Sequence, residues 1–242
     1  MSNQILVELQ EFMGSDRSIA NSAWTSSFDK TKRDNKTELE VETLVKKLAQ
    51  DKHSTPFESV VLRFWIRMPI FTDRQHMTHR IASHNGLSGR YRTMPTDYYE
   101  IPEDVEQILN KVDSLPNIFP TKDNPNNKWT IFTAYYESCE TAINNYKLSI
   151  DKLKYYEKQQ VITNTEFKRA REILRGQLPT SGFTERTTIF NLRSFANYQK
   201  LRNSEHAQPE IQTVARLMLE EVIKYNICPT AIKALEENNW II

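Results

Sequence analysis

Residues 60–69 read VVLRFWIRMP, and this stretch decides how the chain has to fold. Two kinds of position alternate along it: Leu62, Phe64, Ile66 and Met68 on one face, Arg63, Trp65 and Arg67 on the other. Alternation with a period of two predicts a half-buried strand, whose arginines face something polar or anionic. Pro69 ends the strand and can begin a helix that carries Arg74 to His79.

Strands are few on either side of this stretch. Ile5, Val7 and Leu9 alternate with mostly polar neighbours and predict one more strand. Helical spacing predicts helices at 37–51, 105–112, 129–156, 165–175, 190–202 and 211–225, with a polar turn at 53–59 and a surface loop at 116–127. No repeat or linker separates these segments. The pattern predicts a strand-poor α+β fold in a single domain, residues 1–242.

The composition restricts the kinds of partner. The 242 residues carry a net charge of +1 with 26% charged residues, so any anion site has to be local. Cys139 and Cys228 have no metal-like spacing and fit a reducing cytoplasm. We expect no signal peptide and no membrane span, because no apolar run is long enough. The five glycines form no phosphate-binding loop of the P-loop or dinucleotide type.

Residues 74–92, RQHMTHRIASHNGLSGRYR, concentrate positive charge. They hold four arginines, three of the five histidines and no acid. Arginine forks suit phosphates and flat carbonyl edges, and Ser88 and Gly89 can offer a hydroxyl and backbone N–H groups. Gly86 and Gly89 break the stretch into a loop. A small phosphorylated ligand fits this pattern better than a nucleic-acid polymer, and a solvated basic loop is the alternative.

A second polar cluster is NLRSFANYQKLRNSEHAQ, residues 191–208. On a helix, five side chains fall near one line: Asn191, Phe195, Tyr198, Arg202 and His206. Arg193 and Asn197 form a further pair, four residues apart. Burying such a polar face without a partner is costly, so either water or a polar ligand covers it. The spacing does not choose between these two.

Catalysis by a protein nucleophile has little support. No G-x-S-x-G elbow is present, although Ser83 and Ser88 have histidines nearby in the sequence. The histidines of residues 74–92 have no carboxylate among them, so we expect no metal site. An anion-binding enzyme without its own nucleophile usually relies on a cofactor for the chemistry.

The stretch RQHMTHRIASHNGLSGRY resembles the signature of the flavin-dependent thymidylate synthases. That signature has an Arg-Gln pair, then Arg-His-Arg, seven residues and a Ser, and runs on to Arg-Tyr. Four more blocks match in the same order: MGSDRSIANSAWTSS (13–27), HSTPFES (53–59), RGQLP (175–179) and FNLRSFANYQKLRNSEHAQPEI (190–211). Together they cover roughly a third of the chain. Five ordered matches are far more specific than one.

The resemblance implies a single-domain α+β fold with a central antiparallel sheet flanked by helices. It implies a cytoplasmic homotetramer with active sites at subunit junctions, where FAD and dUMP bind side by side. The expected reaction is reductive methylation of dUMP to dTMP, with 5,10-methylenetetrahydrofolate as carbon donor and NADPH as reductant. We expect neither a nucleic-acid nor a membrane partner.

The resemblance also implies site residues, which are assigned at the positions that match the family's blocks. The flavin would be lined by Thr55, Glu58, His79, Arg80, Asn85, Asn191, Arg193, Asn197 and His206. The nucleotide would be held by Gln75, Ser88, Gly89 and Arg90 of one subunit and by Arg175 and Arg202 of another. The catalytic positions would be Arg202, Ser88 and His53. Arg202 would activate the base, Ser88 would chiefly contact phosphate or base, and His53 would sit near the folate and nicotinamide entrance.

Three positions depart from the family pattern. Thr78 stands in place of the first arginine of Arg-His-Arg, Gly86 in place of a glutamate, and Trp24 in place of a frequent arginine. The missing charge at position 78 could be supplied by Arg63, Arg67 or Arg92, and the glycine would widen the pocket. A wider, wetter pocket would favour a hydroxymethyl product, which makes a pyrimidine nucleotide hydroxymethylase the first alternative. A non-catalytic nucleotide or single-strand nucleic-acid binder is the second.

Overall fold

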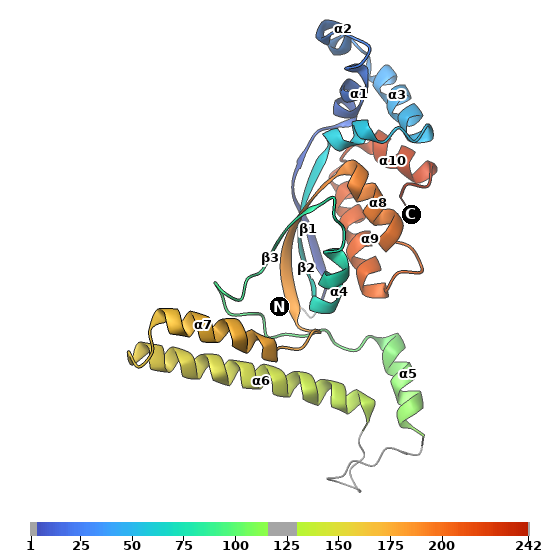
Figure 1. The fold of residues 1–242 in the computed structure, drawn as a ribbon. Helices are drawn as coiled ribbons and strands as arrows, with labels where there is room; N and C mark the ends of the chain where they lie inside the picture. Colours follow the sequence, from blue (N-terminus) through green and yellow to red (C-terminus); the bar gives the residue numbers. More distant parts are fainter. Residues whose placement is uncertain (1–3, 116–129, 242) are drawn as a thin grey trace. The chain divides into compact units, whose positions relative to one another are not determined.

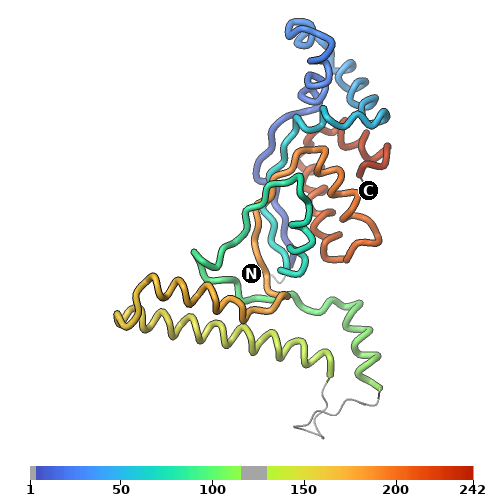
Figure 2. The backbone as a smooth tube through the Cα atoms, in the orientation of Figure 1, coloured from blue at the N-terminus to red at the C-terminus, as the bar shows by residue number. Residues whose placement is uncertain are grey.

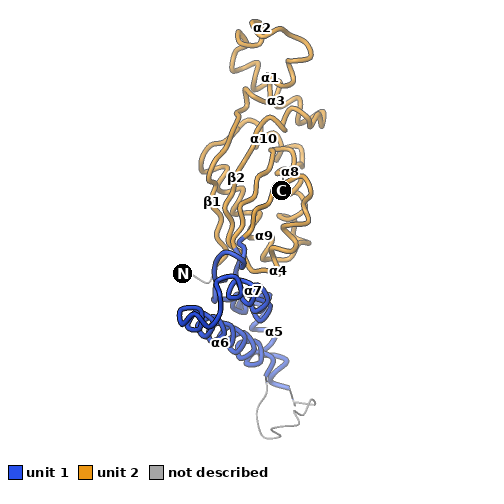
Figure 3. Tube along the Cα trace, turned by 60° about the vertical axis from the view of Figure 1, so that its left-hand side comes forward, with its two compact units in different colours: residues 1–3, 87–184 blue, residues 4–86, 185–242 orange. Residues whose placement is uncertain are grey.

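The computed structural model describes residues 4–115 and 130–241, and Figure 1 shows its helices and strands. The chain divides into two compact units, coloured separately in Figure 3. The larger unit consists of residues 4–86 and 185–242, and residues 87–184 make up nearly all of the smaller one. The smaller unit is therefore an insertion in the sequence of the larger. The single domain over residues 1–242 stays a prediction.

A four-stranded sheet organises the chain, in the order β1-β2-β4-β3. The strands are β1 (Leu6–Met13), β2 (Val61–Pro69), β3 (Ser83–Gly86) and β4 (Phe183–Asn191). The β1–β2 and β3–β4 pairs are antiparallel, with a register shift between Leu9 and Glu11 in β1. These strands, flanked by helices, confirm the predicted α+β class.

Strand β2 has the two faces that its alternation predicts. The side chains of Leu62, Phe64, Ile66 and Met68 are fully buried. Phe64 stacks on Phe195 of helix α8 (Leu192–Arg202) with 5.8 Å between ring centroids. On the other face, Arg63 pairs with Glu11 across the β1–β2 ladder at 2.8 Å. The polar partner expected for this face is thus the neighbouring strand.

Helices cover the sheet of the larger unit. In addition to α8, the larger unit contains α1 (Asp16–Trp24), α2 (Lys30–Asp34), α3 (Glu38–Gln50), the 3₁₀ helix η1 (Thr55–Ser59), α4 (Ile70–His76), α9 (Pro209–Lys224) and α10 (Pro229–Glu237). Figure 1 shows α8 and α9 against one face of the sheet, and α9 contacts both β1 and β2. The apolar residues of α9, among them Ile211, Val214 and Met218, are fully buried there.

Four local predictions for the larger unit need correction. Residues 53–59 are not a polar turn, because Pro56 and Phe57 of η1 are buried. Helix α4 ends at His76 and does not reach His79. Residues 83–86 form strand β3 where a loop was expected, and β4 was not expected at all. Both strands are rich in polar residues, so their pairing depends on cross-strand contacts that apolar alternation does not reveal.

The smaller unit is helical. It contains α5 (Glu103–Asp113), α6 (Ile131–Lys158), α7 (Asn164–Leu174) and the short 3₁₀ helix η2 (Arg175–Gln177). The backbone trace in Figure 2 shows α6 and α7 running side by side. Cys139, Ile143 and Tyr146 are buried along one stripe of α6, as their spacing predicts. The predicted loop at 116–127 and the predicted helix start at Trp129 lie outside the described residues.

None of the helices in the described residues is long and apolar enough to cross a lipid bilayer.

Candidate functional site

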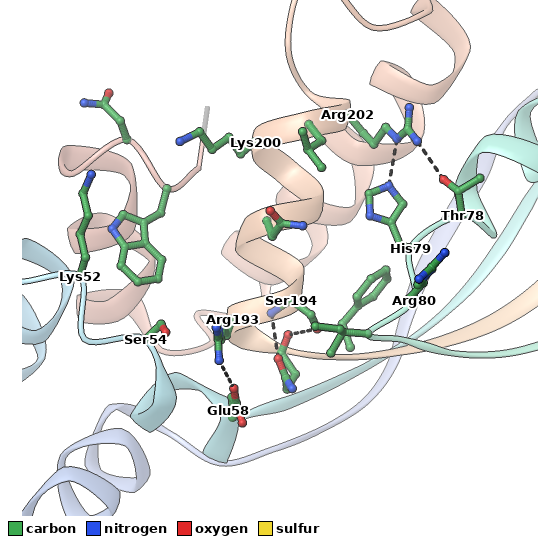
Figure 4. Close-up of a pocket in the computed structure, with 17 residues that line it drawn as sticks. Lys52, Ser54, Glu58, Thr78, His79, Arg80, Arg193, Ser194, Lys200 and Arg202 are labelled. Atoms are coloured by element: carbon green, nitrogen blue, oxygen red, sulfur yellow. Dashed lines mark hydrogen bonds and ion pairs between the residues drawn. The ribbon is translucent and has the colours of Figure 1, made fainter.

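A pocket of about 710 Å³ opens in the larger unit. Its walls, drawn in Figure 4, come from four parts of the chain that are distant in sequence. The turn after α3 and η1 supply Lys52, Ser54 and Glu58, the segment after α4 supplies Thr78 to Ile81, and the C-terminal segment supplies Asn239 and Trp240. The end of β4 and helix α8 supply Phe190, Asn191, Arg193, Ser194, Asn197, Lys200, Leu201 and Arg202. A volume of this size is typical of small-molecule sites.

Helix α8 presents a polar face to the pocket, and this face starts at the first residues of the helix. Asn191 is its N-cap, and its Oδ1 accepts a hydrogen bond of 2.8 Å from the backbone N–H of Ser194. Arg193 lies in the first turn and pairs with Glu58 at 2.6 Å. Asn197 follows one turn later on the same side. This polar face therefore lines the pocket.

The five residues expected along one line of α8 separate into three groups. Phe195 and Tyr198 are fully buried in the core. Asn191 and Arg202 border the pocket at the two ends of the helix. His206 lies beyond the last helical residue and is exposed, so it does not share this face. The pair Arg193 and Asn197 describes the pocket face better than the longer line does.

Arg202 is fixed by hydrogen bonds from two of its nitrogens. Its Nε donates to Nε2 of His79 at 2.9 Å. Its Nη2 donates to Oγ1 of Thr78 at 3.0 Å and to the carbonyl of Gln75 at 3.3 Å. Within the described part of the chain, no hydrogen-bond partner is found for Nη1. The guanidinium is therefore held in place and keeps N–H groups for a ligand.

His79 is neutral at neutral pH. Burial, together with the charge of Arg202, lowers the pKa of His79 to about 4. A neutral ring is consistent with its hydrogen bond, because Nε2 can accept from Arg202 only when it carries no proton. The ring also meets the buried ring of Tyr198 edge to face, with 4.6 Å between centroids.

The charges around the pocket suit an anionic ligand with a polar ring. Five cations line it: Lys52, Arg80, Arg193, Lys200 and Arg202. Glu58 is the only carboxylate among the pocket's described lining residues, and it already pairs with Arg193. Such a set matches the phosphates and the carbonyl edge of a flavin dinucleotide, and Phe190 and Trp240 add aromatic surface. The residues present therefore fit FAD.

A second group of predicted residues lies in the smaller unit. A Cβ on Gly89 would come within 2.9 Å of Cδ of Arg175, so a larger residue at this position would displace the arginine stem. Arg90 pairs through Nε with Glu172 at 2.9 Å, and its carbonyl accepts a hydrogen bond from Arg171. Ser88 lies next to Gly89, and its Oγ accepts from the backbone N–H of Arg90. Arg175 therefore packs against Gly89 of its own chain.

Six of the nine residues expected to line a flavin do line the pocket: Glu58, His79, Arg80, Asn191, Arg193 and Asn197. Thr55, Asn85 and His206 do not border it. Asn85 lies on β3 and is exposed. His53 is exposed between two pocket residues, and Gln75 bonds Gln208 through its side-chain amide. The roles of these residues stay predictions.

One side of the pocket was not predicted from the sequence. No function was predicted for four of its lining residues, Lys52, Ser54, Asn239 and Trp240, although Lys52 and Ser54 flank His53. Trp240 is placed by a hydrogen bond from its backbone N–H to the carbonyl of Leu235 and by contact with Phe57. No motif marks the C-terminal residues, so only the fold could bring them here. Ser194 and Lys200 fell inside a matched block but had no assigned role.

The departures from the family pattern have local explanations. The Thr78 hydroxyl donates to the carbonyl of Gln75 at 2.7 Å and accepts from Arg202, so it helps to hold an arginine already present. The arginines expected to supply the missing charge are not among the residues that line the pocket: Arg63, Arg67 and Arg92. Trp24 is a core residue, only 8% exposed.

The space beside Gly86, where a wider pocket was expected, is occupied. A Cβ there would lie 3.1–3.2 Å from the guanidinium of Arg186, which fills the space. Arg186 is held by Asp73 in a two-pronged ion pair, with distances of 2.5 and 2.6 Å. Glycine at this position makes room for that guanidinium against the strand.

Comparisons with known proteins give consistent results. A family described as "Thymidylate synthase complementing protein" matches residues 8–230. A protein of Kosmotoga olearia is 32% identical over 94% of this chain and 88% of its own length, and one of Treponema denticola is 29% identical over 96% and 79%. Both are called flavin-dependent thymidylate synthase. Among solved structures, a UMP/dUMP methylase, PolB from Streptomyces cacaoi bound with 5-Br dUMP, superimposes with a TM-score of 0.66 at 23% identity, covering 98% of this chain and 97% of that one.

Proposed function

The chain belongs to the family of thymidylate synthase complementing proteins, and from this premise we propose that it is a flavin-dependent thymidylate synthase that methylates dUMP to dTMP. One observation carries the proposal. Residues expected at a flavin on family resemblance, from segments around positions 58, 79 and 193, converge on one pocket that is rich in cations. The chain is thus a flavoprotein and a methyltransferase.

The pocket of the larger unit is the flavin site. Asn191, Arg193 and Asn197 of α8 would hold FAD from one side, and His79 and Arg80 from another. When bound and reduced by NADPH, FAD would supply the hydride that reduces the transferred carbon. The residues of the chain would bind and orient it, and the opposite side of α8 is packed in the core.

Arg202 is the residue that activates the nucleotide base. Carbon 5 of uracil is a poor nucleophile, and a guanidinium at the pyrimidine edge favours the form of the ring that has lost its N3 proton. That form carries more electron density at carbon 5. Donors that are already oriented are effective in such a role because they need no rearrangement during the reaction. The two anchored nitrogens of Arg202 provide this orientation.

The nucleotide would be held through its phosphate by Ser88, Gly89, Arg90 and Arg175, with Gln75 and Arg202 at the base. In the proposed homotetramer, each site takes Gln75 and residues 88–90 from one subunit and Arg202 from another. The packing of Arg175 against Gly89 supports placing Arg175 with the phosphate group of its own chain rather than with Arg202. This modifies the expected division of residues between subunits.

The co-substrates are 5,10-methylenetetrahydrofolate, which provides the carbon, and NADPH, which provides reducing power. His53 would stand at their entrance; its exposure beside Lys52 and Ser54 of the pocket supports that place. Ser88 would contact phosphate or base. We place the protein in the cytoplasm, a location supported by its two free, buried cysteines.

The relatives support methylation over the alternatives. Their shared name is that of a thymidylate synthase, and the filling of the space beside Gly86 by Arg186 removes the argument for a wetter pocket. A hydroxymethylase and a non-catalytic nucleotide binder are therefore not favoured.

FAD binding tests the site directly. Titration of the purified protein with FAD, followed by flavin fluorescence, is expected to show saturable binding. Arg193→Gln removes a charged donor from the pocket and should weaken binding roughly 10- to 100-fold, as expected for a lost charge-assisted hydrogen bond. Arg216→Gln is the matched control, because Arg216 is on the surface of α9 and pairs with Glu220. A wild-type protein that takes up no FAD would instead support the binder.

A further inference from the structure

A chain of hydrogen bonds runs through the core of the larger unit below the pocket. It links four elements: α8, α4, β4 and β3. His76 Nδ1 lies 2.9 Å from the Tyr198 hydroxyl, and its Nε2 lies 2.9 Å from Oγ1 of Thr188. The same Oγ1 lies 3.1 Å from Nδ1 of His84, whose Nε2 lies 3.3 Å from the carbonyl of His79. Three of these side chains, His76, Thr188 and Tyr198, are fully buried.

Cross-strand pairing explains why these groups meet. His84 and Thr188 are direct partners in the antiparallel β3–β4 ladder, so their side chains lie on the same face of the sheet. His76 is the last residue of α4, and its ring meets the ring of His84 edge to face with 5.2 Å between centroids. Polar side chains here occupy positions that an apolar core would normally fill, and each one is satisfied by the next.

The carbonyl at one end determines the direction of every bond. A carbonyl only accepts, so His84 donates from Nε2 and, as a neutral ring, accepts at Nδ1. The Thr188 hydroxyl then donates to His84 and must accept from Nε2 of His76. His76 in turn accepts at Nδ1 from the hydroxyl of Tyr198. Each group donates to the next, from Tyr198 to the backbone of His79.

The ring of His79 is fixed from the other side. The Arg202 guanidinium can only donate, so Nε2 of His79 carries no proton and the neutral ring keeps its proton on Nδ1. In the described residues, Nδ1 has no hydrogen-bond partner within the protein. Figure 4 shows this ring on the pocket wall, between Arg202 and Arg80.

We propose that Tyr198, His76, Thr188 and His84 are positioning residues which, together with Arg202, present His79 to the pocket ligand as a neutral Nδ1–H donor. The buried chain holds the backbone of His79, and Arg202 selects the tautomer of its ring. The inference rests on the proposed function for the identity of the ligand: an Nδ1–H donor is suited to a carbonyl oxygen or an unprotonated ring nitrogen, both of which the flavin ring offers. A protonated ligand nitrogen would be repelled.

The electrostatic environment supports neutral rings throughout. Burial is the largest cause that lowers the pKa of His76 well below its usual value, and the charges of His84, Arg186, His79 and Arg202 add to it. Burial also lowers the pKa of His84, although the carbonyl of His79 and the charge of Asp73 oppose this change. One proton per ring is the condition under which the directions above hold.

Nuclear magnetic resonance of the ligand-free, ¹⁵N-histidine-labelled protein tests this chain of hydrogen bonds. The two tautomers of a neutral histidine ring give different two-bond ¹H–¹⁵N patterns, so no activity measurement is needed. The expected result is an Nδ1–H tautomer for His79 and Nε2–H tautomers for His76 and His84. A proton on Nε2 of His79, or charged rings at neutral pH, would overturn the proposal.

A matched pair of variants tests the consequence for binding. Thr188→Val keeps the shape of the side chain but breaks the chain of hydrogen bonds in its middle. The ¹H–¹⁵N patterns of His76 and His84 should therefore change. FAD should bind about 3- to 10-fold more weakly, as expected for one lost neutral hydrogen bond. Thr187→Val, one residue earlier on the opposite face of β4, should change neither. Tyr198→Phe removes only the first donor and should alter the pattern of His76 alone.

Identical spectra in the Thr188 and Thr187 variants would contradict the positioning role. A wild-type protein with the expected tautomers that binds no FAD would refute the proposed function and leave the hydrogen-bond chain intact.

Discussion

Arg202 combines anchoring and availability in one side chain. Two of its nitrogens are occupied by His79, Thr78 and Gln75, which leaves the third for a ligand. A lysine at this position could not reproduce this, because an ammonium lacks the planar fork that can bond protein and ligand at once. The same geometry explains why threonine is acceptable at position 78, since its small hydroxyl accepts from the guanidinium and a second arginine would repel it.

The removal of this guanidinium tests its role. Arg202→Ala should lower kcat roughly 100- to 1,000-fold, because one oriented donor is lost from the place where charge develops during the reaction. The affinity for FAD, measured without dUMP, should change much less. Arg216→Ala is the control for the loss of an arginine from the surface. Turnover near the wild-type rate in Arg202→Ala would exclude Arg202 as the activating group.

His76 makes stability depend on pH. Its pKa is lowered in the folded protein, so below the usual histidine value of 6.5 the unfolded chain binds more protons than the folded one. Stability is therefore complete above that value and is lost as the pH falls. For a histidine that stays neutral when folded, the change from about pH 7 to about pH 5 costs roughly 2 kcal/mol. His79 and His84 change in the same direction.

Urea unfolding at the two pH values measures this effect. The free energy of unfolding of the wild type should be lower at pH 5, and in His76→Phe the difference between the two pH values should shrink by roughly 2 kcal/mol. The absolute stability of the variant will also fall, because Tyr198 and Thr188 lose a partner, so the pH difference is the informative quantity. If His76→Phe and the wild type showed the same pH difference in the free energy of unfolding, His76 would bind a proton at pH 5 in the folded protein as it does in the unfolded chain.

At the scale of single elements, the start of α8 serves both folding and binding. Asn191 caps the helix through Oδ1 and also lines the pocket. Asn191→Ala should reduce the free energy of unfolding by about 1 kcal/mol, the usual cost of a lost N-cap. Asn191→Asp keeps a cap and should remain as stable as the wild type, but it places a negative charge beside an anionic ligand and should weaken FAD binding. If the aspartate variant bound FAD as tightly as the wild type, Asn191 would not face the flavin.

Elements also differ in how well the sequence predicts them. Strand β2 was predictable because each apolar side chain in its alternating pattern is buried, and α6 because Cys139, Ile143 and Tyr146 repeat at helical spacing. Strands β3 and β4 were not, because His84 and Thr188 fill inward positions and are stabilised by hydrogen bonds to residues from other elements. Of the pocket, the α8 face was predictable from spacing and motif. Trp240 and Lys52 were not, since only the folded chain brings them together.

At the scale of the whole molecule, we propose that the active site is assembled from more than one polypeptide. Arg90 and Arg175 belong to the smaller unit and Arg202 to the larger one. In the proposed homotetramer, Arg90 and Arg202 of one site come from different chains, and this arrangement can be tested by mixing variants that are each inactive.

Hybrid tetramers should recover activity. If Arg90→Ala and Arg202→Ala chains are co-expressed in equal amounts and assemble at random, about a quarter of the sites will contain both arginines, and activity should approach a quarter of the wild-type value. Either variant alone, or the two purified separately and mixed without subunit exchange, provides the baseline. Activity no higher than this baseline after co-assembly would show that one chain provides both arginines.

We propose that this chain uses FAD to place a methyl group on dUMP, and the mass of the nucleotide product distinguishes this reaction from its alternatives. The purified protein is supplied with FAD, NADPH, 5,10-methylenetetrahydrofolate and dUMP, and the nucleotide is analysed by mass spectrometry, with one reaction lacking FAD. We predict conversion of dUMP to a product heavier by a single methylene unit, identical to dTMP, only when FAD is present. A product carrying a hydroxymethyl group, or dUMP recovered unchanged from a protein that has bound FAD, would contradict this account.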